Sequence, residues 1–293
     1  MRINLVGAFV RNRPFGTEIA FEKGLRLLGH EVSCIDPSVP EPEVWDYDAD
    51  FTIVFKWLEG EHLEHLALCS GKRILFQPDD SRFSHIVEMM QRMRRHCDYA
   101  LTFDKYGAEH ARHIGYLKTD RLIVTADPDI YRPHEVEKDI DVSFVGSLTG
   151  GTNHRSRLEM CQIVSTIPGI RTAFVNDIYD VDEIARIYSR SKVVLNHATD
   201  VGQPFGHGYG YQCRHFEAGF SGACLLSNFV DNEDVLRGFA VFDSKKSLVE
   251  TLVTLLQDDY LRESFARAYF AELNASHRPE HRAVELVDFL GSL

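Results

Sequence analysis

The sequence has no long apolar run and few cysteines. A helix that crosses a bilayer needs about 20 apolar residues in succession, and no run approaches that length. The apolar stretch from Ile3 to Val6 is too short for the core of a signal peptide and fits a first β-strand. The six cysteines of the 293-residue chain are scattered, without a Cys-x-x-Cys pair, so we expect reduced, mostly buried thiols instead of disulfides or a zinc site. These features predict a cytoplasmic protein without a membrane span.

Positive charge is also scarce. Against 44 Asp and Glu residues stand 32 Lys and Arg residues, for a formal net charge of −12. Broad contact with nucleic-acid phosphates needs clustered positive charge, so the composition argues against a nucleic-acid partner. Hydrophobic residues make up 44% and charged residues 26% of the chain, which is typical of a globular protein and excludes a disordered, collagen-like or coiled-coil chain.

Short apolar runs alternate with helical patterns, which predicts an α/β protein with parallel sheets. In the first part we expect strands at 3–6, 31–35, 51–55, 73–76 and 99–102, and helices at 16–28, 61–68 and 82–95. Residues 125–135 are rich in proline and charge, as a linker is. Beyond it we expect strands at 141–145, 171–175, 192–196 and 223–226, helices at 155–165, 181–189 and 212–220, and three helical segments between 244 and 290.

Ligands of open parallel sheets bind outside the carboxyl ends of the strands, so the residues after each strand are the first candidates. Gly7 follows the first strand, and the loop continues through Arg13 to Gly16. The loop lacks a G-x-G-x-x-G fingerprint, which argues against a nicotinamide cofactor. Gly7, Arg13 and Gly16 are candidates for the acceptor side of a cleft; the equal alternative is an ordinary loop whose last glycine caps a helix.

A second glycine-rich loop follows the strand at 141–145. It begins with Gly146 and Ser147 and leads to Arg155 at the start of a helix. Backbone amides of such a loop, together with a helix N-terminus, can cradle phosphate oxygens. The spacing lacks the Lys-Ser/Thr pair of a P-loop, so it does not predict ATP hydrolysis. The alternative is a flexible loop without a ligand.

Residues 196–217 hold the densest group of polar and aromatic side chains. Arg214 and Glu217 are three residues apart and share one face of a predicted helix. Arginine can bind phosphate and a carboxylate can accept two hydrogen bonds from a ribose; the alternative is a simple salt bridge between the two, which is common and contributes little. The histidines of the segment lack the spacing of metal ligands. The remaining candidates of this segment are Asn196, His197, Phe205, Gly206 and Tyr209.

Acidic residues after the strands of the first half have two interpretations. Asp79 and Asp80 follow the strand at 73–76, where either carboxylate could act as a general base or cap the next helix. Capping is favoured for Asp80 and for Asp104. Asp127 and Asp129 lie at the linker, where a turn is favoured over a metal site.

Three segments then carry motifs in a fixed order. They are Asp141–Ser147; Tyr188–Asn196, which reads Y-x-x-S-K-hydrophobic-x-L-N; and Arg214–Ala218, which reads R-x-F-E-A. Asp127-Pro128 with Tyr131-Arg132-Pro133 at the joint, and His277 with Arg282, add to the pattern. Together, residues 101–282 resemble the GT-B glycosyltransferases of the spore-maturation-protein type.

The resemblance implies two Rossmann-like domains that face a cleft and a C-terminal helix that crosses back to the first domain. We therefore expect an acceptor domain at 1–130, a nucleotide-sugar-binding domain at 131–276 and the returning helix at 277–293. It further implies that Glu217 holds the donor ribose, Arg214 the diphosphate, and Gly146 and Ser147 the phosphates. No metal is implied, and no cofactor besides a nucleotide-sugar donor, with a UDP-sugar as first candidate. Many retaining members carry Glu where Tyr209 stands, so the anomeric outcome stays open.

These observations predict a glycosyltransferase that moves a sugar from a nucleoside diphosphate to an acceptor hydroxyl. Asp79 and His197 are the candidate catalytic residues, with Asp79 preferred for deprotonating the acceptor if the reaction inverts. Arg155 and Arg214 would stabilise the leaving group. Two alternatives stay open: a phage-type enzyme acting on modified DNA bases, with Arg11, Arg13, Arg92, Arg94 and Arg95 in a local groove, and a non-catalytic sugar-nucleotide-binding protein. The acceptor and the oligomeric state are not predicted.

Overall fold

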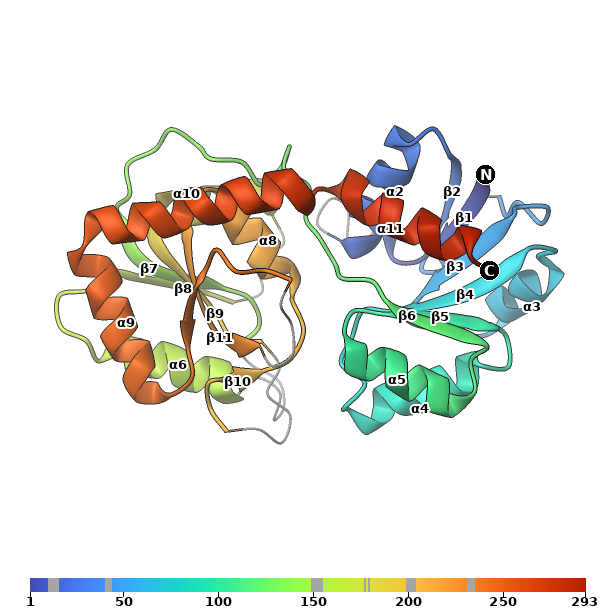
Figure 1. The fold of residues 1–293 in the computed structure, drawn as a ribbon, viewed down its shortest axis with the longest axis horizontal. Helices are drawn as coiled ribbons and strands as arrows, with labels where there is room; N and C mark the ends of the chain where they lie inside the picture. The colour runs from blue at the N-terminus through green and yellow to red at the C-terminus, as the bar shows by residue number, and fades with distance from the viewer. Residues whose placement is uncertain are drawn as a thin grey trace. The chain divides into compact units, whose positions relative to one another are not determined.

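The computed structural model describes residues 1–9, 16–39, 44–148, 155–176, 178, 180–198, 204–230 and 235–293. The chain divides into two compact units (Figure 1). Unit 1 consists of Met1–Thr125 and Arg278–Leu293, and unit 2 consists of Ala126–His277. The sequence placed these divisions at 130/131 and 276/277.

Unit 1 is built around a six-stranded parallel sheet of order β2-β1-β3-β4-β5-β6. Parallel strands that helices cover on both faces read as continuous apolar runs, and the central strand β3 is buried at every residue. The strands are β1 (Arg2–Val6), β2 (Glu31–Ile35), β3 (Phe51–Phe55), β4 (Lys72–Gln77), β5 (Tyr99–Thr102) and β6 (Lys118–Arg121). The helices are α2 (Thr17–Leu27), α3 (Glu61–Leu68), α4 (Ser84–Met93), α5 (Lys105–Ile114) and α11 (Pro279–Gly291).

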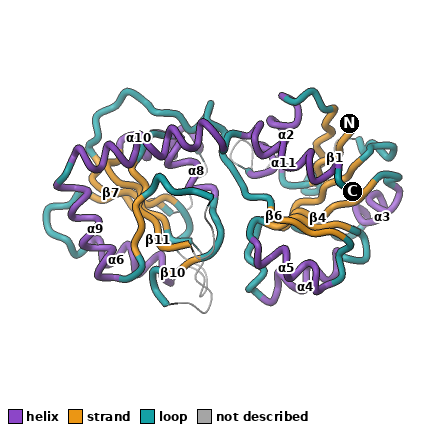
Figure 2. The backbone as a smooth tube through the Cα atoms, viewed as in Figure 1, coloured by secondary structure: helices purple, strands orange, loops and turns teal. Residues whose placement is uncertain are grey.

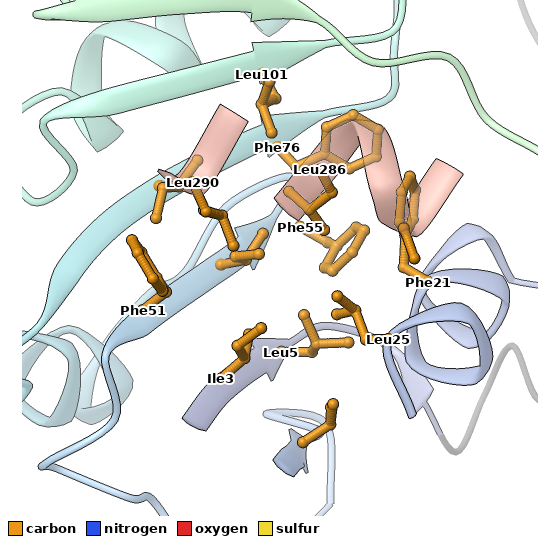
Figure 3. Packing of buried hydrophobic residues seen from close by; sticks show 14 of the residues in the cluster. Ile3, Leu5, Phe21, Leu25, Phe51, Phe55, Phe76, Leu101, Leu286 and Leu290 are labelled. Carbon is orange, nitrogen blue, oxygen red and sulfur yellow. The ribbon is translucent and has the colours of Figure 1, made fainter. Parts of the chain in front are cut away.

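The last helix of the chain, α11, completes the core of unit 1. Figure 3 shows Leu286 and Leu290 of α11 among apolar side chains of β1, β3 and α2. The helix also packs closely on α2, because a β-carbon at Gly24 would lie 2.3 Å from the carbonyl oxygen of Pro279. The chain thus returns to unit 1 after it has completed unit 2. This confirms the predicted C-terminal helix that crosses back to the first domain.

Unit 2 contains a second parallel sheet, of order β10-β11-β9-β7-β8 with β12 beside β11. Helices lie on both sides of its strands (Figure 2). On one side, α6 and α9 form a buried apolar cluster with the sheet, and on the other α8 packs against α7 and α10. The strands are β7 (Ile140–Val145), β8 (Thr172–Val175), β9 (Ser191–Asn196), β10 (His207–Gly208), β11 (Cys224–Val230) and β12 (Ala240–Phe242). The helices are α6 (Arg155–Ser165), α7 (Val181–Arg190), α8 (Cys213–Phe220), α9 (Lys245–Gln257) and α10 (Asp259–Ser276).

The α/β class with two Rossmann-like units is thus confirmed, and the differences concern short or polar elements. The edge strand β6 has the sequence KTDR, which has no apolar residue, and β10 and β12 are two and three residues long. Asp104 caps α5 as expected, since its side chain accepts a hydrogen bond of 2.6 Å from the Gly107 amide. The capping role expected for Asp80 is wrong. Its carboxylate binds the backbone and guanidinium of Arg82, and α4 begins later, at Ser84.

Within the described ranges, no helix combines the length and the hydropathy that a membrane span requires. All six cysteines are free thiols, and Cys213 is the only one that is not fully buried.

Candidate functional site

Arg214 occupies the centre of a polar cluster at the carboxyl edge of the unit 2 sheet. The strands β7 and β9 are neighbours, so Val145 and Asn196 end side by side. From α8, the buried Arg214 reaches both ends: its Nε donates to the Val145 carbonyl at 2.7 Å and its Nη1 to Asn196 Oδ1 at 2.6 Å. The guanidinium also lies over the Phe144 ring, 4.3 Å from its centroid. These contacts hold a positive charge at the edge where ligands of parallel sheets bind.

Gly146 gives the guanidinium its space. The residue directly follows β7, and its φ of +145° lies in a region that side-chain-bearing residues rarely adopt. The Nη2 atom of Arg214 lies against its Cα, on the side where a side chain would project. The glycine that the sequence singled out for phosphate contact therefore also determines where the arginine can sit.

A buried network behind Arg214 fixes the start of α8. His215 Nδ1 lies 3.1 Å from the Gln212 amide nitrogen and 3.2 Å from the Gln212 carbonyl oxygen, and Nε2 lies 3.2 Å from Ser227 Oγ and 3.3 Å from Asn196 Nδ2. Asn196 donates to the same Ser227 hydroxyl at 3.0 Å while it accepts from Arg214. Burial lowers the pKa of His215 to about 3, so the ring is neutral at physiological pH and acts as a structural link.

Glu217 lies one turn further along α8 and does not pair with Arg214. Both residues are described, and no ion pair joins them, so the simple salt-bridge interpretation is wrong. Instead the Tyr188 hydroxyl donates to Glu217 Oε2 at 3.3 Å. Burial raises the pKa of Glu217, while Arg214 and neighbouring phenols act against that rise. A half-buried carboxylate outside a salt bridge keeps acceptor positions for a ligand.

The loop before α8 contributes packing in this structure. The His197 ring is 1% exposed and lies 5.3 Å from the Phe205 ring and 6.0 Å from Phe242, measured between centroids. Gly206 has φ +92° and approaches the backbone of Asp243. The imidazole of His197 has no surface for an acceptor here, and its catalytic role stays a prediction from the sequence. Tyr209 is half-buried in the same loop.

On α6, Arg157 and not the expected Arg155 donates hydrogen bonds to the residues around the site. Arg155 is exposed, whereas Arg157 donates to the His197 carbonyl at 3.2 Å and to Gln212 Oε1 at 3.1 Å. Arg157 thereby connects the end of β9 with the start of α8. Ser147 lies half-buried after Gly146, and the rest of the glycine loop, 149–154, lies outside the described residues.

In unit 1, an ion pair occupies the carboxyl ends of β3 and β4. Lys56 Nζ lies 3.1 Å from Asp79 Oδ2, and both side chains are about two-fifths exposed (42% and 41%). Lys56 has φ +71°, and the Trp57 amide donates across it to the Phe55 carbonyl at 3.1 Å, which makes a classic γ-turn. Such backbone strain occurs preferentially at functional sites.

Two of the acceptor-side candidates of unit 1, Gly7 and Gly16, have structural roles. A β-carbon at Gly7 would lie 3.2 Å from Cβ of Phe55, so this glycine allows close packing. Gly16 is the N-cap of α2 with φ −68°, an ordinary conformation. Arg13 lies outside the described residues.

The comparisons with known proteins agree with this geometry. Residues 138–288, more than half of the chain, match the family described as "Glycosyl transferase-like". The chain belongs to this family. It is a glycosyltransferase. The matched range includes every residue of the Arg214 cluster. No curated protein sequence matches the chain.

Solved structures extend the likeness of this glycosyltransferase to its whole length. Anabaena Alr3699/HepE in complex with UDP and glucose has a TM-score of 0.64 and 12% identity, with 100% of both chains covered. The DNA-modifying enzyme β-glucosyltransferase has a TM-score of 0.67 and 14% identity, again over 100% of both chains. AviGT4, a glycosyltransferase of avilamycin A biosynthesis, has a TM-score of 0.61 and 13% identity, over 100% of this chain and 98% of its own. At these identities the likeness shows the fold, which is GT-B.

Several residues of the two candidate clusters have little signal in the sequence. Tyr188 belongs to a motif, but nothing in the motif shows that its hydroxyl reaches Glu217. Ser227 and Lys56 stand in apolar stretches without a distinctive spacing. Among the described residues, no three His, Cys, Asp or Glu side chains gather as metal ligands would.

Proposed function

We propose that this glycosyltransferase moves a sugar from a nucleoside diphosphate donor, with a UDP-sugar as first candidate, to an acceptor hydroxyl. The Arg214 cluster carries the proposal: a buried guanidinium, fixed by Val145 and Asn196 against Gly146, lies at the sheet edge where a diphosphate would bind. Glu217, with free acceptor positions, would take the ribose hydroxyls. The Alr3699/HepE structure, which contains UDP and glucose, supports the choice of nucleotide.

In the proposed reaction, the acceptor oxygen bonds to the anomeric carbon as the bond from that carbon to the diphosphate oxygen breaks. Negative charge develops on the leaving diphosphate, and Arg214 with the amides after β7 stabilises it. We assign Asp79 of unit 1 as the base that takes the hydroxyl proton, with Lys56 holding its carboxylate. We further propose that the enzyme is of the spore-maturation-protein type, which its motifs at 188–196 and 214–218 resemble, and that it acts in the cytoplasm, which its free thiols suit.

Calorimetry and thermal shift test the donor assignment. A screen of UDP-, GDP- and dTDP-sugars should raise the melting temperature selectively for one nucleotide, because a ligand that binds only the folded state stabilises it. Arg214→Met should weaken binding of that nucleotide at least about tenfold, the loss expected for a hydrogen bond to a charged group. The matched control is Arg190→Met, whose guanidinium pairs with Asp139 on the surface. Wild-type affinity in the Arg214 variant would overturn the assignment.

The proposed base is tested separately from the donor site. Asp79→Asn should lower the turnover number while the donor dissociation constant stays at the wild-type value, since Asp79 belongs to unit 1. Loss of donor binding in this variant, or full turnover, would contradict the role of Asp79.

A DNA acceptor is the second candidate, because the DNA-modifying β-glucosyltransferase shares the fold over the full chain. Against it stands the net charge of −12. Arg94, one of the arginines considered for a basic groove, instead donates to the Gly115 carbonyl at 2.7 Å and lies over the Tyr116 ring. A gel shift with duplex DNA at low and high salt decides between the two, because phosphate contacts weaken steeply with salt.

A further inference from the structure

Tyr131 is a buried tyrosine whose hydroxyl has no partner of good hydrogen-bonding geometry. Its side chain is 1% exposed, and its hydroxyl is one of the buried polar atoms without a hydrogen bond in the described structure. Native proteins rarely leave a buried donor unpaired, so such a group calls for an explanation.

The segment around Tyr131 is held against the two helices that carry Tyr188 and Glu217. The Ser189 hydroxyl accepts from the His134 amide at 3.2 Å, which ties the segment to the end of α7 beside Tyr188. Pro133 lies against Gly222, just beyond α8, where a β-carbon would approach it to 3.2 Å. These contacts hold this part of the linker against α7 and the end of α8 within unit 2.

Tyr131, Tyr188 and Glu217 interact as a group. Burial raises the pKa of the Tyr131 hydroxyl, and the Glu217 carboxylate and the Tyr188 hydroxyl raise it further, so the phenol stays protonated and keeps its donor. Tyr188 already donates to Oε2 of the carboxylate at 3.3 Å. In turn, both phenols, with Arg214, lower the pKa of Glu217 against the effect of burial. Two protonated phenols thus face one carboxylate.

An ionised carboxylate has about four acceptor positions on its two oxygens. If two phenols occupy positions on the inner side, the outer positions remain for two hydroxyls in a fixed orientation. A vicinal diol, such as the 2′- and 3′-hydroxyls of a ribose, presents two donors at the matching spacing. A carboxylate that rotates freely would bind one hydroxyl nearly as well as two and would discriminate less between sugars.

We infer that Tyr131 is a positioning residue of the donor site: with Tyr188 it orients the Glu217 carboxylate toward both ribose hydroxyls, and so selects ribonucleoside over 2′-deoxyribonucleoside diphosphates. This inference rests on the proposed function, because it needs the donor ribose at Glu217. Tyr131 itself touches neither the donor nor the reacting atoms.

The experiment compares UDP with 2′-deoxy-UDP by calorimetry on the wild type and on Tyr131→Phe, which removes only the hydroxyl. The wild type should prefer UDP at least about tenfold, the loss expected for one hydrogen bond to a charged group. Tyr131→Phe should reduce this ratio to about threefold or less, and Tyr188→Phe should do the same. With the full enzyme, the Michaelis constant for the donor should rise while the turnover number changes little.

Tyr269→Phe is the matched control. Tyr269 is fully buried in unit 2, its hydroxyl also lacks a hydrogen bond, and it interacts with Glu272 and Tyr211 instead of Glu217. This variant should keep the wild-type ratio. The inference is overturned if Tyr131→Phe keeps the ratio as well, or if Tyr269→Phe lowers it equally. Failure of the wild type to bind UDP or GDP at all would instead overturn the proposed function, and the inference with it.

Discussion

A β-carbon at Gly146 would lie 2.1 Å from Nη2 of Arg214. A contact this short cannot exist, so the guanidinium occupies its place only because residue 146 is glycine. One residue after a buried strand and one residue on a helix are thus coupled across 68 positions of the sequence. The coupling also gives the site its geometry, because the arginine that would bind a diphosphate rests on the backbone that would approach the same phosphates.

Gly146→Ala should therefore displace Arg214 and weaken donor binding at least about tenfold, the effect of losing a charged hydrogen bond. The positive φ adds a backbone cost of about 1 kcal/mol to the loss of stability. Calorimetry with UDP and chemical denaturation measure the two effects.

Gly169→Ala is the control for this variant. Gly169 has φ +79° in the same unit, and nothing lies within 4 Å of the position that its β-carbon would take. It should lose about the same stability and keep donor affinity. If both variants keep their affinity, Gly146 does not position Arg214 for the donor.

The sequence predicts the layered architecture well, because a short apolar run such as Phe51–Phe55 is typical of a buried strand. It predicts polar edges poorly: β6 has no apolar residue, and only pairing with β5 makes it a strand. For the site, the sequence identifies Arg214 and Glu217 as a helical pair, with a ligand or a salt bridge between them as the two interpretations. It does not show that Arg214 reaches the Val145 carbonyl, because that contact depends on tertiary packing alone.

Leu286→Ala tests whether α11 is part of the core of unit 1. Leu286 is 1% exposed and belongs to the cluster with β1 and α2. Removing a buried leucine side chain leaves a cavity and costs about 2–5 kcal/mol. Val284→Ala on the same helix, where the side chain is 45% exposed, should change stability by less than about 0.5 kcal/mol. Chemical denaturation compares the two, and equal effects would mean that the helix does not pack as described.

Glu217→Gln should stabilise the protein at neutral pH while it impairs donor binding. Burial raises the pKa of Glu217 in the folded state, so ionisation at neutral pH costs folding free energy that glutamine avoids. We expect a gain of about 1 kcal/mol, as is common when a functional residue is replaced. The gain should shrink as the pH falls toward the ordinary glutamate pKa, because the wild-type carboxyl then takes up its proton. A variant that is less stable at pH 7 would contradict the description of a carboxylate disfavoured by burial.

The effect of His215 on the free energy of unfolding should depend on pH in the opposite direction to that of Glu217. Burial lowers its pKa to about 3 in the folded protein, whereas the unfolded chain binds a proton near the ordinary histidine value of about 6.5. Between these values unfolding takes up a proton, so this residue's contribution to stability is complete above about pH 6.5 and is lost as the pH falls. One proton corresponds to about 1.4 kcal/mol per pH unit, or about 2 kcal/mol between pH 6.5 and pH 5.

The comparison of wild type with His215→Gln isolates this effect. The variant has no imidazole to protonate, so its free energy of unfolding should fall less between pH 7 and pH 5, by about 2 kcal/mol relative to the wild type. The exposed His85→Gln variant should follow the wild-type curve. Since a positive charge on the buried ring is costly and the ring contacts Gln212 at the start of α8, that helix end and with it Arg214 should loosen over the same range. Donor affinity in the wild type should therefore decline together with the free energy of unfolding. If the free energy of unfolding of His215→Gln and of the wild type falls in parallel with pH, the fold does not hold the ring neutral.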